Sequence, residues 1–233
     1  MEQEVRHVLP ADIERTSMEI IGAELARMGV TLPVETEAVV KRVIHTTADF
    51  DYVENLRFTP QAAARAVEAL RAGAVVVTDT NMARSGVNKA GLGKLNSQAL
   101  CFMADPEVAA AARAAGSTRA AAAVEKAAAA YPQAAFAVGN APTALLKLCE
   151  LMEGGLRPAL VIAAPVGFVN VVESKRRMFA MCERTGVPCI AAMGRKGGSN
   201  VAAAICNALI YTALDAVDPV KRGARLEIGR AHV

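Results

Sequence analysis

Short apolar runs alternate with longer helical patterns over most of this 233-residue chain, and this alternation constrains the fold more than any other feature. Each run ends in glycine, proline or polar residues, which is typical of a buried strand in a parallel sheet. Strands are expected at residues 74–77, 136–138, 160–164 and 190–193, and a fifth at residues 99–103. Parallel strands need crossover connections, and right-handed helical crossovers place helices on the faces of the sheet. The pattern therefore predicts a three-layer α/β fold.

Helical periodicity fills the segments between these runs and much of the chain before them. A first helix is expected between Pro10 and Gly29, with Ile13, Ser17, Ile21, Leu25 and Met28 on one face. A second is expected from residue 35 to residue 45, with a buried stripe of Val39, Val40, Val43 and Ile44, and a third between Thr59 and Gly73. Further helices are expected at residues 106–115, 118–131, 142–153, 171–184 and 199–214. This order of elements predicts a flavodoxin-like, doubly wound, mostly parallel sheet.

The alternation stops after residue 214. Residues 1–214 are therefore expected to form a single domain, long enough to bury a core without disulfides or a structural metal. Residues 215–233 are rich in charged residues and show no periodicity. They are expected to form a flexible tail, or to be a remnant foreign to the natural protein, and His232 is expected to have no functional role.

Composition excludes several classes of protein. Apolar residues make up 53% of the chain, too many for intrinsic disorder, yet no stretch approaches the roughly 18 consecutive apolar residues of a membrane helix. A net charge of +3 with 4% aromatic residues does not favour nucleic-acid binding and suits a small anionic ligand better. The first residues lack the pattern of a secretory signal, which predicts a cytoplasmic location.

The cysteines are expected to be reduced core residues rather than metal ligands. None of them forms a C-x-x-C pair or lies near a histidine in the sequence. They are Cys101, Cys149, Cys182, Cys189 and Cys206. No protein-bound metal and no cofactor are expected.

The segments that directly follow the predicted strands are the candidate binding loops. In open parallel sheets, ligands bind beyond the carboxyl ends of the strands. Here these positions carry residues 78–82, 139–143, 165–169 and 194–200. Three of the loops lead into a predicted helix, whose free N–H groups attract anions. The sequence therefore predicts a crevice that favours carboxylate or phosphate groups.

The loop at residues 194–200 is the sharpest candidate for anion binding. It combines Arg195 and Lys196 with two glycines and with Ser199, but it matches neither the Walker A order nor G-x-G-x-x-G. Nucleotide binding and a purely structural glycine-rich turn both remain open for this loop. Arg119, next to Thr118 at a predicted helix start, could clamp a second carboxylate or could be an ordinary surface arginine.

His45 is the one histidine that lies far from both ends of the chain. It falls at the end of a predicted helix, next to Thr46 and Thr47, where an imidazole could transfer protons. A structural histidine is the alternative. The sequence contains no G-x-S-x-G nucleophile motif, no H-E-x-x-H motif and no histidine pair suited to a metal.

Five segments of the chain, in this order, resemble precorrin-8X methylmutases and especially cobalt-precorrin-8 methylmutases. The resemblance extends from about residue 13 to residue 214 and is carried by residues 42–52, 78–82, 139–145, 165–169 with 173–175, and 194–200. It implies an isomerase that moves a methyl group from C11 to C12 of the macrocycle without a methyl donor, giving cobyrinic or hydrogenobyrinic acid. It also implies a homodimer with each active site at the subunit boundary.

The resemblance also suggests roles for individual residues. His45 matches the family's active-site histidine, which we expect to act as a general acid near the nitrogen of ring C. Arg119 matches its substrate arginine, and residues 194–198 match its glycine-rich loop. The expected substrate-binding residues are Ser17, Thr80, Met82, Gly86, Arg119, Asn140, Gly167, Phe168, Val169, Arg195, Lys196, Gly197 and Gly198. The basic residues would neutralise the carboxylates of the tetrapyrrole, and Val166, Gly167, Phe168 and Val169 would form a smooth floor under it.

Three questions stay open at this point. Residues 44–51 favour the cobalt series, in which the metal would arrive within the substrate and have no protein ligand. A tetrapyrrole carrier without catalytic activity would use the same crevice. A flavodoxin-like nucleotide or flavin protein is the third interpretation.

Overall fold

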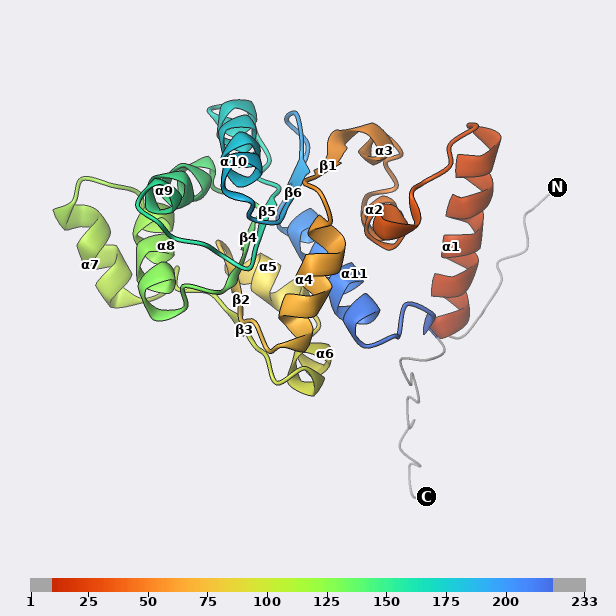
Figure 1. Cartoon of the computed structure of the whole chain (residues 1–233), viewed down its shortest axis with the longest axis horizontal. Coiled ribbons are helices and arrows are strands. Elements are labelled where there is room, and N and C mark those ends of the chain that lie inside the picture. Colours follow the sequence, from red (N-terminus) through yellow and green to blue (C-terminus); the bar gives the residue numbers. More distant parts are fainter. Residues whose placement is uncertain (1–9, 220–233) are drawn as a thin grey trace, which may run out of the picture.

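The computed structural model describes residues 10–219 and contains a six-stranded sheet between two layers of helices (Figure 1). The strands are β1 (Leu56–Phe58), β2 (Val76–Thr78), β3 (Ala99–Leu100), β4 (Ala135–Val138), β5 (Leu160–Ala163) and β6 (Cys189–Ala192). Their order across the sheet is β1-β6-β5-β4-β2-β3, and all neighbours except β1 and β6 are parallel. The five parallel strands thus follow the flavodoxin order, which confirms the predicted fold class.

The antiparallel edge strand β1 was not expected from the sequence. It pairs with β6 through the partners Leu56 and Ala192, Arg57 and Ala191, and Phe58 and Ile190. Only Leu56 of these three β1 residues is buried, because one face of an edge strand stays open to solvent. Three residues with a central arginine do not form an apolar run, so the pattern that predicts buried strands could not detect β1.

The long helices agree with the predicted segments, and three short ones were missed. The helices are α1 (Pro10–Arg27), α2 (Val34–Thr47), α3 (Tyr52–Asn55), α4 (Ala62–Arg71), α5 (Asn81–Gly86), α6 (Lys89–Lys94), α7 (Pro106–Ala114), α8 (Arg119–Ala130), α9 (Pro142–Glu153), α10 (Val171–Thr185) and α11 (Ser199–Ala213). The short helices α3, α5 and α6 have no apolar stripe long enough to give a helical period. Side-chain caps mark two of them, since Thr80 accepts from the N–H of Ala83 and Asn88 from that of Gly91.

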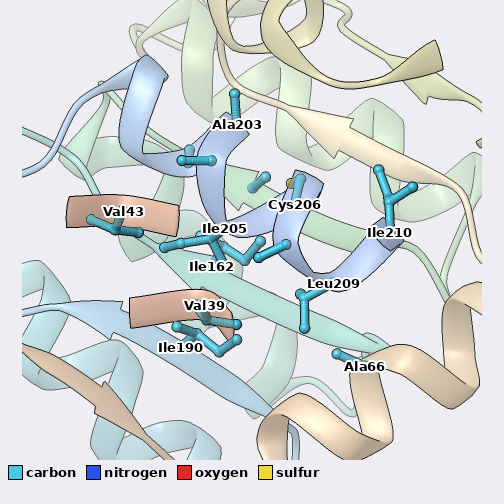
Figure 2. Close-up of a cluster of buried hydrophobic side chains, with 14 of the residues drawn as sticks. Val39, Val43, Ala66, Ile162, Ile190, Ala203, Ile205, Cys206, Leu209 and Ile210 are labelled. Atoms are coloured by element: carbon cyan, nitrogen blue, oxygen red, sulfur yellow. The ribbon is translucent and has the colours of Figure 1, made fainter. Parts of the chain in front are cut away.

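Side chains of the sheet alternate between two apolar cores. One core lies under α2, α4 and α11 and contains Val76 and Ile162, while the other lies under α8, α9 and α10 and contains Val77 and Val161. Figure 2 shows the first core, where Ile205 and Leu209 of α11 face Ile162 and Ile190 of the sheet. Helix α11 packs against α2, α4 and α5, so most of its surface is buried and its apolar pattern runs around the helix.

Helix α1 is the outermost helix on its side of the molecule and packs on α2 (Figure 1). Ile21 and Leu25 are buried there, but Ile13 and Met28 are about half exposed, so the expected apolar face was drawn too wide. The reason is that a helix with a single neighbouring helix buries only a narrow stripe. The buried stripe expected for α2, from Val39 to Ile44, is confirmed.

The segment after α11 folds back onto the domain as far as residue 219. Ala216 is buried and its N–H donates to the carbonyl of Tyr211, while Asp215 accepts from the Arg71 guanidinium at 3.2 Å. The rest of the expected tail, residues 220–233 with His232, lies outside the described residues.

All five cysteines are free thiols. Cys149, Cys182, Cys189 and Cys206 are buried as expected, whereas Cys101 is only half-buried because it lies in the loop after the short strand β3. None of the described helices is long and apolar enough to cross a bilayer.

Candidate functional site

The carboxyl ends of the five parallel strands meet at one edge of the sheet, and the predicted binding loops all start there. The strand order reverses direction between β2 and β4, which are neighbours in the sheet. The chain leaves β2 toward α5, on the side of α11, and leaves β4 toward α9, on the opposite side. Doubly wound proteins bind their ligands at such a reversal, and the region bounded here by the loops after β2, β4, β5 and β6 is called the crevice below.

Asp79 is a buried carboxylate at the strand ends. It directly follows β2, is 5% exposed, and accepts three backbone hydrogen bonds, from the N–H groups of Gly139, Asn140 and Ala141 at 2.7 to 2.8 Å. Burial raises the pKa of Asp79, and the three amide donors oppose that rise. The carboxylate thus joins the loops after β2 and β4.

Thr80 and Ser199 join the same region to the start of α11. Their hydroxyl oxygens lie 2.8 Å apart, and Thr80 also caps α5. A side chain at Gly139 would come within 2.7 Å of the Cα atom of Ser199, so the β4 loop and α11 are in close contact. Thr80 is half-buried and Asn140 is exposed, which leaves both polar side chains next to the open crevice.

The loop between β6 and α11 crosses the end of β5 at very short range. Gly197 has a φ of +159°, and a Cβ atom there would lie 2.3 Å from the carbonyl oxygen of Ala164. The N–H of Gly198 donates to that same carbonyl at 2.8 Å, and the N–H of Gly167 donates to the carbonyl of Arg195 at 3.2 Å. Glycine is required at position 197 by this close approach.

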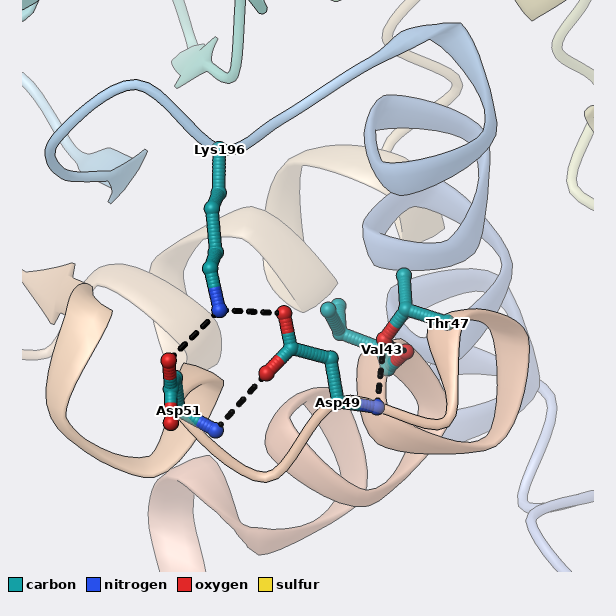
Figure 3. Close-up of polar contacts among 5 residues, drawn as sticks. All are labelled: Val43, Thr47, Asp49, Asp51 and Lys196. Atoms are coloured by element: carbon teal, nitrogen blue, oxygen red, sulfur yellow. Dashed lines mark hydrogen bonds and ion pairs between the residues drawn. The ribbon is translucent and has the colours of Figure 1, made fainter.

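Lys196 extends from this loop to the C-terminal end of α2 (Figure 3). Its Nζ atom lies 2.6 Å from Oδ2 of Asp49 and 2.5 Å from Oδ2 of Asp51. The hydrogen bond from Lys196 lowers the pKa of Asp49, and the two carboxylates raise the pKa of Lys196. Its charge is therefore compensated within the protein, whereas the sequence analysis assigned it to the carboxylates of a ligand.

Lys175 supports the same loop from the protein interior. This residue of α10 is fully buried, and its Nζ atom donates to the carbonyls of Gly194 at 3.0 Å and of Lys196 at 2.7 Å. Burial lowers the pKa of Lys175 to about 8. The loop is thus held by one lysine below it and by its own lysine on the side of α2.

The rim of the crevice is apolar and cationic. Phe168 and Val169, in the loop after β5, and Met82, in α5, each expose more than 70% of their surface. The Arg195 guanidinium lies 5.4 Å from the centre of the Phe168 ring, in a cation–π arrangement. An exposed aromatic ring beside a cation suits a flat ligand with carboxylates at its edge.

Arg119 lies at the same edge of the sheet, at the first residue of α8. It is exposed, and the preceding residue, Thr118, donates to the hydroxyl of Thr143 near the start of α9 at 2.9 Å. This bond holds the starts of α8 and α9 together beside Asn140. Arg119 is therefore at the end of α8 that lies nearest to the crevice.

His45 is half-buried in the last turn of α2. Arg42 and Thr46 of the same helix line a cavity of about 240 Å³ between α2, α5 and α11, together with Gly86 and Asn200, and His45 is not among the residues that line it. His45 is the basic residue in the last turn of α2, where the helix carbonyls favour a positive charge. Asp49 and Asp51, which follow this helix in the sequence, accept from Lys196 and so link the end of the helix to the loop after β6.

Ser17 is on α1, away from the strand ends. Its hydroxyl donates to the carbonyl of Ile13 in its own helix at 2.8 Å. One turn earlier, Glu14 pairs with Arg42 at 2.5 Å, and Arg42 stacks on the ring of Tyr211 at 5.2 Å. Ser17 is therefore linked, through the packing of α1 on α2, to Arg42 in the lining of the cavity beside α2, and not to the loops at the strand ends.

Sequence reasoning missed Asp79, Lys175, Asp49 and Asp51 as candidate site residues. A usable signal existed for two of them. Asp79 follows a strand directly, and Lys175 falls on the buried stripe of α10 with Val171, Met178 and Cys182. A lysine in an apolar stripe indicates a buried partner, because an unpaired charge there would be very costly.

Larger cavities lie elsewhere in the described chain. One of about 470 Å³ is at the opposite, amino edge of the sheet and is lined mainly by alanines, and one of about 660 Å³ lies between α1, α2 and residues 217–219. Neither contains a predicted site residue. Among residues 10–219, no three His, Cys, Asp or Glu side chains are grouped so that they could hold a metal ion.

Comparison with known proteins gives a consistent result. The family model of precorrin-8X methylmutase matches residues 12–212. The cobalt-precorrin-8 methylmutase of Salmonella typhimurium is 45% identical over 176 residues, covering 75% of this chain and 80% of the relative. The precorrin-8X methylmutase of Pseudomonas aeruginosa is 39% identical over 198 residues, covering 84% and 93%.

A solved structure agrees with this result. The precorrin-8X methylmutase of Thermus thermophilus superimposes with a TM-score of 0.77 at 40% identity, covering 87% of this chain and 98% of that one. The expected resemblance is confirmed, and the interpretation as a nucleotide or flavin protein is set aside. With a family model that spans nearly the whole described chain, this protein belongs to the precorrin-8X methylmutase family and is an isomerase.

Proposed function

We propose that this chain moves a methyl group from C11 to C12 of precorrin-8X or cobalt-precorrin-8, giving hydrogenobyrinic or cobyrinic acid. The observation that carries the proposal is the exposed rim at the strand ends, where the Arg195 guanidinium stacks on Phe168 next to the exposed Val169. A tetrapyrrole offers a broad apolar plane to such a floor and carboxylates to the flanking arginines.

The proposed reaction is a 1,5-sigmatropic shift, in which the bond from the methyl carbon to C11 breaks as the bond to C12 forms. The composition of the substrate does not change, so no methyl donor is needed. His45 donates a proton or a hydrogen bond to the nitrogen of ring C and favours the rearranged conjugation. A general acid of this kind contributes about 10²- to 10⁴-fold, and holding the macrocycle in a reactive geometry supplies the remainder.

The remaining site residues would bind the macrocycle and its carboxylates. Arg119 and Arg195 would pair with carboxylates, and Thr80 and Asn140 would donate hydrogen bonds at the bottom of the crevice. The other proposed contacts are Ser17, Met82, Gly86, Gly167, Phe168, Val169, Lys196, Gly197 and Gly198. For Lys196, a contact with the substrate would have to compete with Asp49 and Asp51.

We also propose that the active enzyme is a homodimer. The cavity beside α2 measures about 240 Å³, which is below the roughly 300–1,000 Å³ of typical ligand pockets. A second subunit over the exposed Met82, Phe168 and Val169 would enclose a macrocycle that one chain leaves open. Sedimentation of the full chain is expected to give twice the monomer mass, and a monomer that retains full turnover would contradict this.

A cytoplasmic location and the cobalt form of the substrate complete the proposal. Five free cysteines, four of them buried, are compatible with a reducing compartment. The cobalt form is favoured by residues 44–51, and it predicts a higher kcat/KM for cobalt-precorrin-8 than for precorrin-8X. A preference for the metal-free substrate would reverse this assignment.

The decisive experiment follows the visible spectrum and the mass of the tetrapyrrole after mixing with the protein in the absence of S-adenosylmethionine. A methyl shift changes the chromophore at constant mass, whereas a carrier binds the pigment and leaves it unconverted. His45→Ala is expected to abolish conversion while binding remains measurable by spectral titration. Undiminished turnover in this variant would remove the proposed role of His45.

A further inference from the structure

The loop that follows β6 is held from below by a buried lysine that none of the proposed roles uses. Lys175 projects from α10 and has no exposed surface, and its ammonium group donates to the carbonyl oxygens of Gly194 and Lys196. These two carbonyls are its hydrogen-bond partners among residues 10–219. A buried cation without a carboxylate partner costs free energy unless other polar groups solvate it. Here the carbonyls of Gly194 and Lys196 do so, and the bonds fix their orientation in the loop.

The two bonds determine which way two peptide planes face. The carbonyl of Gly194 belongs to the same peptide plane as the N–H of Arg195, and the carbonyl of Lys196 to the same plane as the N–H of Gly197. Every peptide bond in the described chain is trans, so each N–H points opposite its carbonyl. The N–H groups of Arg195 and Gly197 therefore point away from Lys175.

Neither of these two N–H groups donates a hydrogen bond to another described residue. The other backbone hydrogen bonds of this loop involve the N–H of Gly198, which donates to the carbonyl of Ala164, and the carbonyl of Arg195, which accepts from the N–H of Gly167. Two amide donors that face outward from one loop, beside an exposed arginine, form a surface that attracts a carboxylate.

We propose that Lys175 is a positioning residue for substrate recognition, which holds the carbonyls of Gly194 and Lys196 inward so that the N–H groups of Arg195 and Gly197 and the Arg195 side chain face a substrate carboxylate. This inference rests on the proposed tetrapyrrole substrate and adds a residue that acts through the loop without touching the ligand. Burial lowers the pKa of Lys175 to about 8, and no carboxylate raises it.

The test replaces the ammonium group and keeps the length of the side chain. In Lys175→Met, KM for the tetrapyrrole and Kd for the product are expected to rise about tenfold, the size of effect that follows loss of one or two charge-assisted hydrogen bonds, while kcat changes little. Lys147→Met is the matched control, because Lys147 lies on α9 and pairs with Glu125 and Glu150 outside the loop. Its KM and kcat are expected to equal those of the unmodified chain.

Several results would overturn the proposal. A Lys175→Met protein with unchanged KM and Kd would show that the loop does not need the lysine, and a fall in kcat at constant KM would assign Lys175 to the chemical step. If Lys175→Met does not fold, as judged by circular dichroism, Lys175→Gln is measured instead and the same rise in KM is expected. Partial recovery of KM in Lys175→Arg, which restores donors and charge, separates positioning from simple packing.

The proposed function is tested independently in the same series. If the unmodified chain binds the product without converting the substrate, the methylmutase proposal fails, while the ratio of Kd values between Lys175→Met and the unmodified chain still tests the role of Lys175. If the unmodified chain converts the substrate and that ratio is one, only the inference about Lys175 fails.

Discussion

The Nζ atom of Lys196 lies 2.6 Å from Oδ2 of Asp49, which joins the loop after the last strand to the end of the helix that carries His45. Asp51 accepts from the same ammonium group at 2.5 Å. Two ion pairs therefore link the loop proposed to bind carboxylates to the segment that follows the helix of the proposed general acid. A change in the loop or in this segment is expected to affect the other, even though no bond between His45 and the loop is needed.

Loss of this connection is expected to cost little stability and to show coupling between its members. Because the Lys196 side chain is 42% exposed and solvent screens its ion pairs, Lys196→Met should lower the free energy of unfolding only slightly. Asp49→Asn should cost a similar amount, and the double variant should cost less than the sum. Urea denaturation of the four proteins measures this. Strict additivity, or an equal loss in the exposed control Lys94→Met, would contradict it.

Asp79 is expected to be the most sensitive residue at the strand ends. Asp79→Ala leaves three amide N–H groups, one of them in a buried hydrogen bond, without their acceptor and should lower the free energy of unfolding by about 2–4 kcal/mol. Asp79→Asn keeps one acceptor oxygen and should lose less. Chemical denaturation distinguishes them, with Asp12→Ala on the surface of α1 as a control. Equal stability of all three variants would show that the loop finds other acceptors.

Gly197 is expected to tolerate no side chain. In Gly197→Ala, the new methyl group would lie 2.3 Å from the carbonyl oxygen of Ala164, so the backbone of the loop has to move. We expect a loss of about 2–4 kcal/mol and a higher KM, measured by thermal melting and steady-state kinetics. The matched control is Gly93→Ala in α6, where no atom lies within 4 Å of the new methyl group and helix propensity predicts a small gain. A stable, active Gly197→Ala protein would show that the loop is not tightly held against β5.

Lys175 is expected to make stability depend on alkaline pH in a defined direction. Its pKa falls from 10.5 to about 8 on folding, so between these values the unfolded chain holds a proton that the folded chain has released. Stability from this group therefore rises with pH in that window. Relative to Lys175→Met, the unmodified chain should gain on the order of 1–3 kcal/mol as the pH rises through it. Comparing the two proteins cancels the opposing effect of the buried cysteines. A pH-independent difference would show that Lys175 stays charged or that its pKa is ordinary.

Much of the architecture could be derived from local patterns in the sequence. The apolar runs that became β2, β4, β5 and β6 and the periodic segments that became α8 to α11 were located within a few residues, since burial on both faces and a 3.6-residue period are visible in any short window. The residue types after each strand also identified the correct edge of the sheet. Short elements were missed for the opposite reason: β1 has three residues and α3 four, too few to show a period.

The contacts within the site were decided by the tertiary structure. Lys196 and Asp49 are 147 residues apart, and nothing local to Lys196 indicates that its charge is compensated from the end of α2. In the same way, Asp79 meets amides some 60 residues away because β2 and β4 are neighbours in the sheet. The sequence by itself determined which residue types stand at the strand ends, because these follow from local burial and chain order. Which of those charges face a ligand and which hold the loops together was decided only when packing brought distant segments within hydrogen-bonding distance.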